Sequence, residues 1–368
     1  MTLLRGALRT ARYARSWKSG AEVATEEVQI QRCGEPVAAT LMHPGRTHPP
    51  LPGWIALGGV SRMGRHHPQL VRFSRALAST GAAVLIPEIP EWRRLAMSPV
   101  VAAPTIRGCV DLLRCRPEVR HDRFGLIGFS FGAPQVAIAA TQEDVAEYVA
   151  GIVLFGGYCC LERTMTCQLT GEHEWEGTEY RLPPDPFGGW VVGSNHLTDI
   201  PGCEDAGDVA AALHRLADAA SGQRIAAWDP RHDRMIGQLR DALPASRRPL
   251  FDLFATRSTV SRPDAAEGRD LALRLAEACR RVEPLLDPAA DLARVDLPTR
   301  LVHGRGDRLI PFTEGLRLQQ GLPERARRGL TVTGLFNHSA DHAPTRMMDR
   351  ALEGMKMLGA IRGLVNTV

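Results

Sequence analysis

The stretch that decides the fold is Phe124-Gly125-Leu126-Ile127-Gly128-Phe129-Ser130-Phe131-Gly132. It begins as a short apolar run, typical of a buried strand, and leads into an alanine-rich segment that predicts a helix to about Ala140. Its last five residues match Gly-x-Ser-x-Gly, a pattern that places a serine on a sharp turn between a strand and a helix. The flanking glycines allow neighbouring backbone to approach closely. We therefore expect the hydroxyl of Ser130 to project from the edge of a sheet, and a packing turn with an idle serine is the alternative.

Strand and helix patterns alternate on both sides of this stretch. Before it we predict two strands within residues 27–41 joined by a turn at 33–36, a strand at 53–57, a helix at 68–79, a strand at 82–87 and a helix at 103–113. After it comes a strand at 152–155. Such alternation predicts right-handed crossovers and a mostly parallel, twisted sheet with helices on both faces.

The alternation stops between residues 156 and about 290, where a polar, turn-rich part precedes helical patterns at 208–220 and 265–282. It resumes with a strand at 299–304, a helix at 312–320, a strand at 330–333 and a long helix from about 344 to 361. The expected organisation is an N-terminal amphipathic helix or tail (1–24), a first half of the core (25–155), a mainly helical insert (156–290) and a second half of the core (291–368).

A serine hydroxyl becomes a nucleophile at neutral pH only when an imidazole takes its proton and a carboxylate orients that imidazole. After a Gly-x-Ser-x-Gly serine, the acid and then the histidine follow along the chain. The candidate acid is Asp307, which comes just after the strand at 299–304 in Gly304-Arg305-Gly306-Asp307. An aspartate that serves only the turn is the alternative.

The candidate base is His338, because the loop after the strand at 330–333 carries it close to the strand end. His342 lies four residues further on and is the alternative base. We expect His303 to be a buried histidine at the end of its own strand.

Negative charge on an acyl intermediate needs two backbone N–H donors, one from the residue after the nucleophile and one from the loop after an early strand. Phe131 supplies the first, and we assign the second to Val60, which follows Gly58-Gly59. Ser61, Arg62 and His66 come next, and we expect them to be loop or helix-start residues. A position near the mouth of the pocket is the alternative.

Taken together, these motifs resemble the α/β-hydrolase superfamily, in the broad group of capped serine esterases, lipases and dienelactone-hydrolase-like proteins. The resemblance covers about residues 25–160 and 290–368 and depends on Leu57-Gly58-Gly59, the turn at Ser130, the segment from His303 to Pro311, and His338. Gly58 stands where many relatives have histidine. The resemblance implies an eight-stranded sheet, a Ser130–His338–Asp307 triad, an acyl-serine intermediate and no cofactor.

The same resemblance implies that residues 156–290 form a cap over the active site. This segment contains no motif that defines a substrate. Four aromatic residues within it are candidates for lining a pocket, although a small core of the insert is the commoner role for such side chains. These residues are Trp175, Phe187, Trp190 and Trp228.

Composition excludes several classes of function. The net charge of +4 is small, and no basic run is interleaved with aromatic residues, so we expect no nucleic-acid partner. The eight cysteines form no Cys-x-x-Cys pair, which argues against a metal site and favours reduced thiols in a cytoplasmic protein. No run of about 18 apolar residues predicts a membrane span.

The N-terminal segment has an apolar helical face and a basic one. The apolar face carries Leu3, Leu4, Ala7, Leu8 and Ala11, and the other carries Arg5, Arg9 and Arg12. A helix packed on the protein's own surface, or a loose tail, is the role we favour, and contact with a membrane surface is the alternative.

The leading functional hypothesis is hydrolysis of a carboxylic ester, with an apolar acyl or aromatic small molecule as substrate. An amidase or peptidase, an acyltransferase on the same triad, and a non-catalytic binding module of the same fold are the alternatives. The sequence predicts no particular oligomeric state.

Overall fold

The computed structural model describes residues 2–45, 50–261, 263–336, 338 and 347–368. Within these residues the main sheet has eight strands in the order β1-β2-β4-β3-β5-β6-β9-β10. The strands are β1 (Ala24–Arg32), β2 (Glu35–His43), β3 (Gly53–Leu57), β4 (Ala83–Pro87), β5 (Phe124–Phe129), β6 (Val149–Phe155), β9 (Thr299–Gly304) and β10 (Arg327–Thr333). Strand β2 is antiparallel to both of its neighbours, and all the other neighbouring pairs are parallel. The mostly parallel sheet that the alternation predicts is confirmed.

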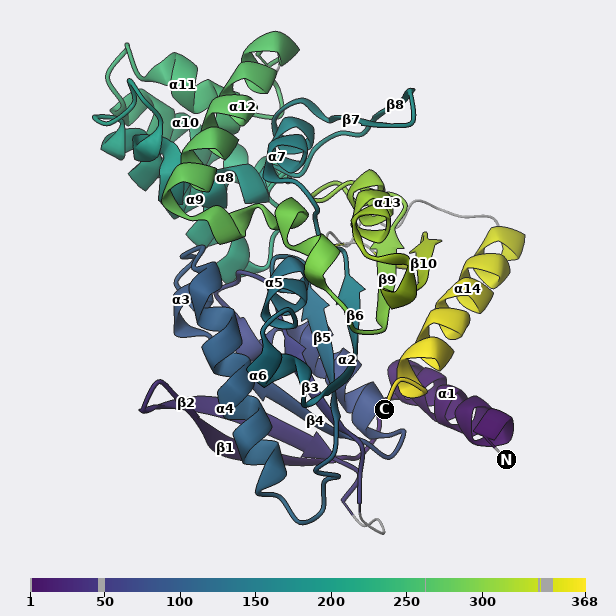
Figure 1. Cartoon of the computed structure of the whole chain (residues 1–368). Coiled ribbons are helices and arrows are strands. Elements are labelled where there is room, and N and C mark those ends of the chain that lie inside the picture. The colour runs from purple at the N-terminus through teal and green to yellow at the C-terminus, as the bar shows by residue number, and fades with distance from the viewer. Residues whose placement is uncertain (1, 46–49, 262, 337, 339–346) are drawn as a thin grey trace.

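Helices cover both faces of this sheet (Figure 1). The helices of the core are α1 (Thr2–Ser19), α2 (Pro68–Ala78), α3 (Pro90–Arg93), α4 (Ala102–Arg114), α5 (Gly132–Ala139), α6 (Glu143–Ala146), α13 (Phe312–Gly321) and α14 (Met347–Val365). Successive side chains of a strand point to opposite faces, so Ile55 and Leu57 join an apolar cluster with α4 and α5, whereas Trp54 and Ala56 join a second cluster with α1, α2 and α14. Because both faces of β3 and β4 are buried, the sequences of these strands are unbroken apolar runs.

The chain leaves the sheet after β6 and returns to it at β9. Figure 1 shows the intervening elements gathered beyond the carboxyl ends of β5, β6 and β9. These elements are α7 (Leu161–Thr170), β7 (Glu172–Trp175), β8 (Thr178–Arg181), α8 (Phe187–His196), α9 (Gly207–Gln223), α10 (Asp233–Ala242), α11 (Arg248–Phe254) and α12 (Ala265–Val282). We keep the name insert for residues 156–290, the range expected from the sequence. The hairpin β7–β8 lies within the part predicted only as polar and turn-rich, because its strands are partly exposed and lack apolar alternation.

Short 3₁₀ helices complete the described secondary structure. They are η1 (Gly64–His66), η2 (Pro99–Val101), η3 (Leu197–Asp199), η4 (Pro230–His232), η5 (Pro284–Leu286), η6 (Pro288–Ala290), η7 (Leu292–Arg294) and η8 (Glu324–Ala326).

Helix α1 packs against α2 and α14 (Figure 1). Among the described helices none is long and apolar enough to cross a membrane. All eight cysteines are free thiols, and six of them are buried.

Candidate active site

Ser130 lies on the turn between β5 and α5. Its φ of 55° is in the left-handed region, which residues with a side chain rarely adopt. The Ser130 N–H donates to the carbonyl of Phe155 at the end of β6 (2.8 Å), and the Ser130 carbonyl accepts from the N–H of Ala133 in α5 (3.0 Å). These two bonds hold the strained turn in place, with the serine half-buried at the end of the sheet.

Glycines around the turn are required by close approach of the backbone. A Cβ on Gly128 would lie 2.5 Å from the carbonyl oxygen of Gly132, and one on Gly132 would overlap the carbonyl oxygen of Gly58. A Cβ on Gly59 would lie 3.2 Å from the Oγ of Ser130. The glycines of the motif therefore bring the loop after β3 directly against the serine.

Asp307 and His338 meet beyond the carboxyl ends of β9 and β10. The Nδ1 atom of His338 lies 2.5 Å from the Oδ2 atom of Asp307. The other carboxylate oxygen accepts backbone N–H bonds from Leu309 (3.0 Å) and Ile310 (3.1 Å). Because an ionised carboxylate only accepts hydrogen bonds, Nδ1 carries the proton, and Nε2 is the ring atom of the neutral imidazole that can accept one.

Burial and charge shift both groups. Asp307 is fully buried, which alone would raise the pKa of its carboxyl group, but the facing His338 outweighs burial and holds this pKa below its usual value. Burial alone would lower the pKa of His338, but the Asp307 carboxylate raises it above 6.5. Each group of the pair thus stabilises the charged form of the other.

The imidazole of His338 packs against the strand end that also holds the serine. A Cβ on Gly156 would lie 2.6 Å from the Cε1 atom of His338, and Gly156 directly follows Phe155, whose carbonyl accepts the Ser130 N–H. The Nε2 atom of His338 is buried and has no hydrogen-bond partner among the described residues. The alternative base, His342, lies outside the described residues.

The two amides assigned to charge stabilisation come from the residue after Ser130 and from the loop after β3. Phe131 precedes the first residue of α5, and Val60 lies on the loop after β3. In the part of the chain that the structure describes, neither backbone N–H donates to another group. Both residues, together with Ser130, line one cavity.

This cavity has a volume of about 60 Å³ and lies between the core and the insert. The insert contributes mostly apolar side chains to its wall, among them Leu161, Met165, Phe187, Val191 and Val192. Sequence reasoning missed these residues except Phe187, because their spacing indicates only a helix with a buried face.

The other three aromatic candidates of the insert do not appear among the described residues that line the cavity. Trp190 is fully buried and donates its indole N–H to the carbonyl of Phe254 (2.9 Å), so it belongs to the core of the insert. Trp175 and Trp228 stack under guanidinium groups.

The insert is tied to the loop after β3. Arg62 forms an ion pair with Asp218 of α9 (2.9 Å), and its backbone N–H donates to Ser221 Oγ (2.9 Å). Arg62 was expected to be a loop residue, and its contact with α9 could not be found from the sequence. His303 is buried as expected, with Nε2 2.9 Å from the carbonyl oxygen of Ile310.

Asp185 is a further residue of the site that sequence reasoning missed. It is buried in the insert, accepts the N–H of Phe187 (3.1 Å) and adds to the rise in the pKa of His338. Its position between two prolines, Pro184 and Pro186, indicates a rigid turn, which is the only signal that the sequence offers.

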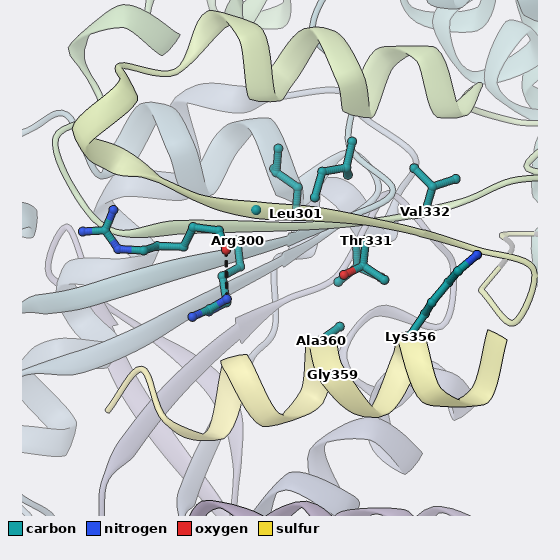
Figure 2. A pocket seen from close by; sticks show the side chains of 11 residues that line it. Arg300, Leu301, Thr331, Val332, Lys356, Gly359 and Ala360 are labelled. Atoms are coloured by element: carbon teal, nitrogen blue, oxygen red, sulfur yellow. Dashed lines mark hydrogen bonds between the residues drawn. The ribbon is translucent and has the colours of Figure 1, made fainter. Parts of the chain in front are cut away.

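A larger cavity of about 360 Å³ lies elsewhere, between β9, β10 and α14 (Figure 2). Figure 2 shows Thr331 and Ala360 in the gap between the sheet and α14, whereas Leu301 and Val332 point to the other face. Its described lining includes neither a carboxylate nor an imidazole, so we assign no reaction to it. Nor does any group of three or more His, Cys, Asp or Glu side chains in the described ranges gather as metal ligands would.

Comparison with solved structures finds similar folds at low sequence identity. An acylaminoacyl peptidase of Pyrococcus horikoshii is similar with a TM-score of 0.50 and 12% identity over 95% of this chain, which spans only 42% of the peptidase chain. A Pyrobaculum calidifontis esterase has a TM-score of 0.47 and 16% identity over 99% of this chain and 93% of its own. A dienelactone hydrolase of Anabaena variabilis has a TM-score of 0.45 and 14% identity over 94% of this chain and 98% of its own.

No family model matches the sequence, and no curated protein matches it. The likeness to solved structures therefore concerns the fold.

Proposed function

We propose that this chain, which has the α/β-hydrolase fold, is a serine hydrolase that cleaves carboxylic esters through an acyl-serine intermediate. The observation that carries the proposal is the hydrogen bond between His338 and Asp307 beside the strained turn of Ser130. A nucleophile, a base with a free ring nitrogen and a buried carboxylate that orients the base are the parts that acyl transfer needs.

In the proposed reaction, Ser130 Oγ attacks the carbonyl carbon of the ester while His338 Nε2 takes the hydroxyl proton. The electron pair of the C=O bond moves to its oxygen, which accepts the N–H bonds of Phe131 and Val60. When the tetrahedral intermediate collapses, the bond to the alkoxy group breaks and His338 returns the proton to the leaving alcohol. Water then attacks the acyl carbon while His338 takes its proton. The bond between that carbon and Ser130 Oγ breaks, His338 returns the proton to Oγ, and the carboxylic acid leaves.

The lining that the insert contributes favours a substrate with an apolar acyl or aromatic group, because Met165, Phe187 and Val191 line the cavity beside Ser130. Ligand cavities generally measure about 300–1,000 Å³. At about 60 Å³ the cavity is much smaller, so we propose that the insert acts as a cap that moves to admit the substrate. Closure would then exclude water during acylation.

Labelling with a fluorophosphonate tests the proposal. The wild-type protein should be labelled, and the folded Ser130→Ala variant should not be. Labelling that persists in Ser130→Ala would show that another residue is the nucleophile. A wild-type protein that is folded but not labelled would favour the non-catalytic binding module. His338→Ala should lower kcat by about 10³-fold or more, whereas His342→Ala should have little effect. The opposite result would make His342 the base.

A panel of p-nitrophenyl esters of increasing acyl length, with the matching anilides, separates the alternatives of the same triad. Preference for esters with longer acyl chains is the expected result. Faster turnover of anilides would favour an amidase or peptidase. Product esters formed with an added alcohol would favour an acyltransferase.

A further inference from the structure

Helix α1 buries one face and leaves apolar residues exposed on the other. Tyr13 is buried against the ring of Phe73 with their centroids 5.8 Å apart, so the inner face already has its packing partner. On the outer face Leu4 and Leu8 are 71% and 54% exposed. Packing within the chain therefore does not explain why these two exposed positions are apolar.

Half of the exposed large apolar residues in the described part of the chain lie on α1 and α14. These five of the ten residues are Leu4, Leu8, Leu352, Met355 and Leu358. The two helices pack against each other, as Figure 1 shows. We call the exposed faces of α1 and α14 the helical corner. Single exposed apolar residues are ordinary on a protein surface, but Leu4 and Leu8 are neighbours one turn apart on α1, and paired exposure of this kind marks an interaction site.

The charge of α1 is of one sign. The helix has five cationic residues and no acidic one; the cationic residues are Arg5, Arg9, Arg12, Arg15 and Lys18. Four of them are exposed, namely Arg5, Arg12, Arg15 and Lys18. No carboxylate of the described residues lies within 4.0 Å of these four side chains. Elsewhere on the surface many guanidinium groups pair, as Arg107 does with Asp144.

The helical geometry places apolar and cationic side chains next to one another on the outer face. Leu4 and Leu8 are one turn apart, and Arg15 comes three turns after Leu4, so all three point in nearly the same direction. Arg12 lies on the flank of the same face. Such a face fits the boundary between lipid headgroups and acyl chains, where leucines can enter the apolar region while neighbouring arginines keep their guanidinium groups among the headgroups.

We propose that the helical corner docks on an anionic lipid surface. Leu4 and Leu8 enter the boundary of headgroups and acyl chains, while Arg5, Arg12 and Arg15 stay with the lipid phosphates. A second copy of the chain fits this face poorly, because a symmetric pair would bring two sets of unpaired cations together. The proposal is independent of the reaction at Ser130.

Flotation of the full-length protein with lipid vesicles tests the proposal. Vesicles of equal parts phosphatidylglycerol and phosphatidylcholine should carry the protein at low ionic strength, and vesicles of phosphatidylcholine alone should carry much less. Arg12→Glu with Arg15→Glu should weaken binding by at least about 30-fold, since each cation near an anionic surface contributes a factor of about five. Leu4→Ser with Leu8→Ser should weaken it by about tenfold or more.

Matched changes on the insert serve as controls. Arg234→Glu and Leu273→Ser alter exposed residues of α10 and α12 and should leave binding unchanged. Equal binding to both kinds of vesicle, no binding to the anionic ones, or the same loss in control and test variants would overturn the proposal. So would a dimer in analytical ultracentrifugation that the Leu4 and Leu8 changes dissociate, because a second copy would then cover this face.

Discussion

Replacing Gly156 with alanine should displace the imidazole of His338 without substituting any residue of the proposed triad. Gly156 has a φ of 56°, and a Cβ there would lie 2.6 Å from the Cε1 atom of His338 and 2.9 Å from that of Phe336. Ordinary van der Waals contact begins near 3.4 Å, so the imidazole has to retreat by about 0.8 Å.

Two costs follow from this geometry. A left-handed backbone conformation costs a residue with a Cβ about 1–2 kcal/mol, which lowers the free energy of unfolding by that amount. A catalytic group misplaced by about 1 Å can cost about 10²-fold in rate. We therefore expect Gly156→Ala to lower kcat/KM for a p-nitrophenyl ester by about 10²-fold, or about 2.7 kcal/mol of transition-state stabilisation.

Gly177→Ala is the matched control. Gly177 has a φ of 78° in the β7–β8 hairpin, but a Cβ there meets nothing within 4 Å. Both variants carry backbone strain, and only Gly156→Ala crowds His338. Urea unfolding should show a similar loss of stability in the two variants, while ester hydrolysis and fluorophosphonate labelling should fall only in Gly156→Ala. A folded Gly156→Ala variant as active as Gly177→Ala would refute the position given to His338 in the mechanism.

Three further changes test other parts of the site. Asp307→Asn removes the carboxylate that raises the pKa of His338, so the acid limb of the kcat/KM profile should move to lower pH, with kcat reduced by about 10⁴-fold. Glu314→Gln should lower the free energy of unfolding in urea by about 1–3 kcal/mol, because it removes the buried charge that accepts two backbone N–H bonds at the start of α7 and pairs with Arg163 (3.0 Å). Arg62→Ala breaks the ion pair with Asp218 and should speed fluorophosphonate labelling by about twofold to fivefold, since the insert is then held less firmly.

The sign of the pH prediction follows from the role of the imidazole. Only neutral His338 can take a proton, so a raised pKa means that activity is lost as the pH falls through that pKa. An acid limb that stays in place in Asp307→Asn would show that another group sets it. Glu324→Gln, on the surface, is the control for Glu314→Gln and should not change stability. Asp218→Ala should reproduce the effect of Arg62→Ala, and labelling that is unchanged in both would mean that this ion pair does not hold the insert.

Local patterns in the sequence predicted most elements of the core. The strand predicted at 299–304 is β9 of the core, and the helix predicted at 265–282 is α12 of the insert. A helix with one buried face has apolar residues at a period of 3.6, and a parallel strand buried on both faces is an unbroken apolar run. No apolar pattern predicted the hairpin β7–β8, because its strands pair through the backbone and their side chains are mostly polar. The long C-terminal helix was predicted from about residue 344, and its described part runs from Met347 to Val365.

The sequence by itself determined where a serine turn would form, since Gly-x-Ser-x-Gly between a strand and a helix is a local arrangement of backbone. It also singled out Asp307 and His338 as candidates by their positions after late strands. Only the tertiary structure decided that these two side chains meet, because strand order and register bring together residues that are 31 positions apart. The wall of the cavity and the contact between Arg62 and α9 were decided in the same way. Contacts between distant segments depend on how whole elements pack, and a periodic pattern records only that a residue is buried, not which residue it faces.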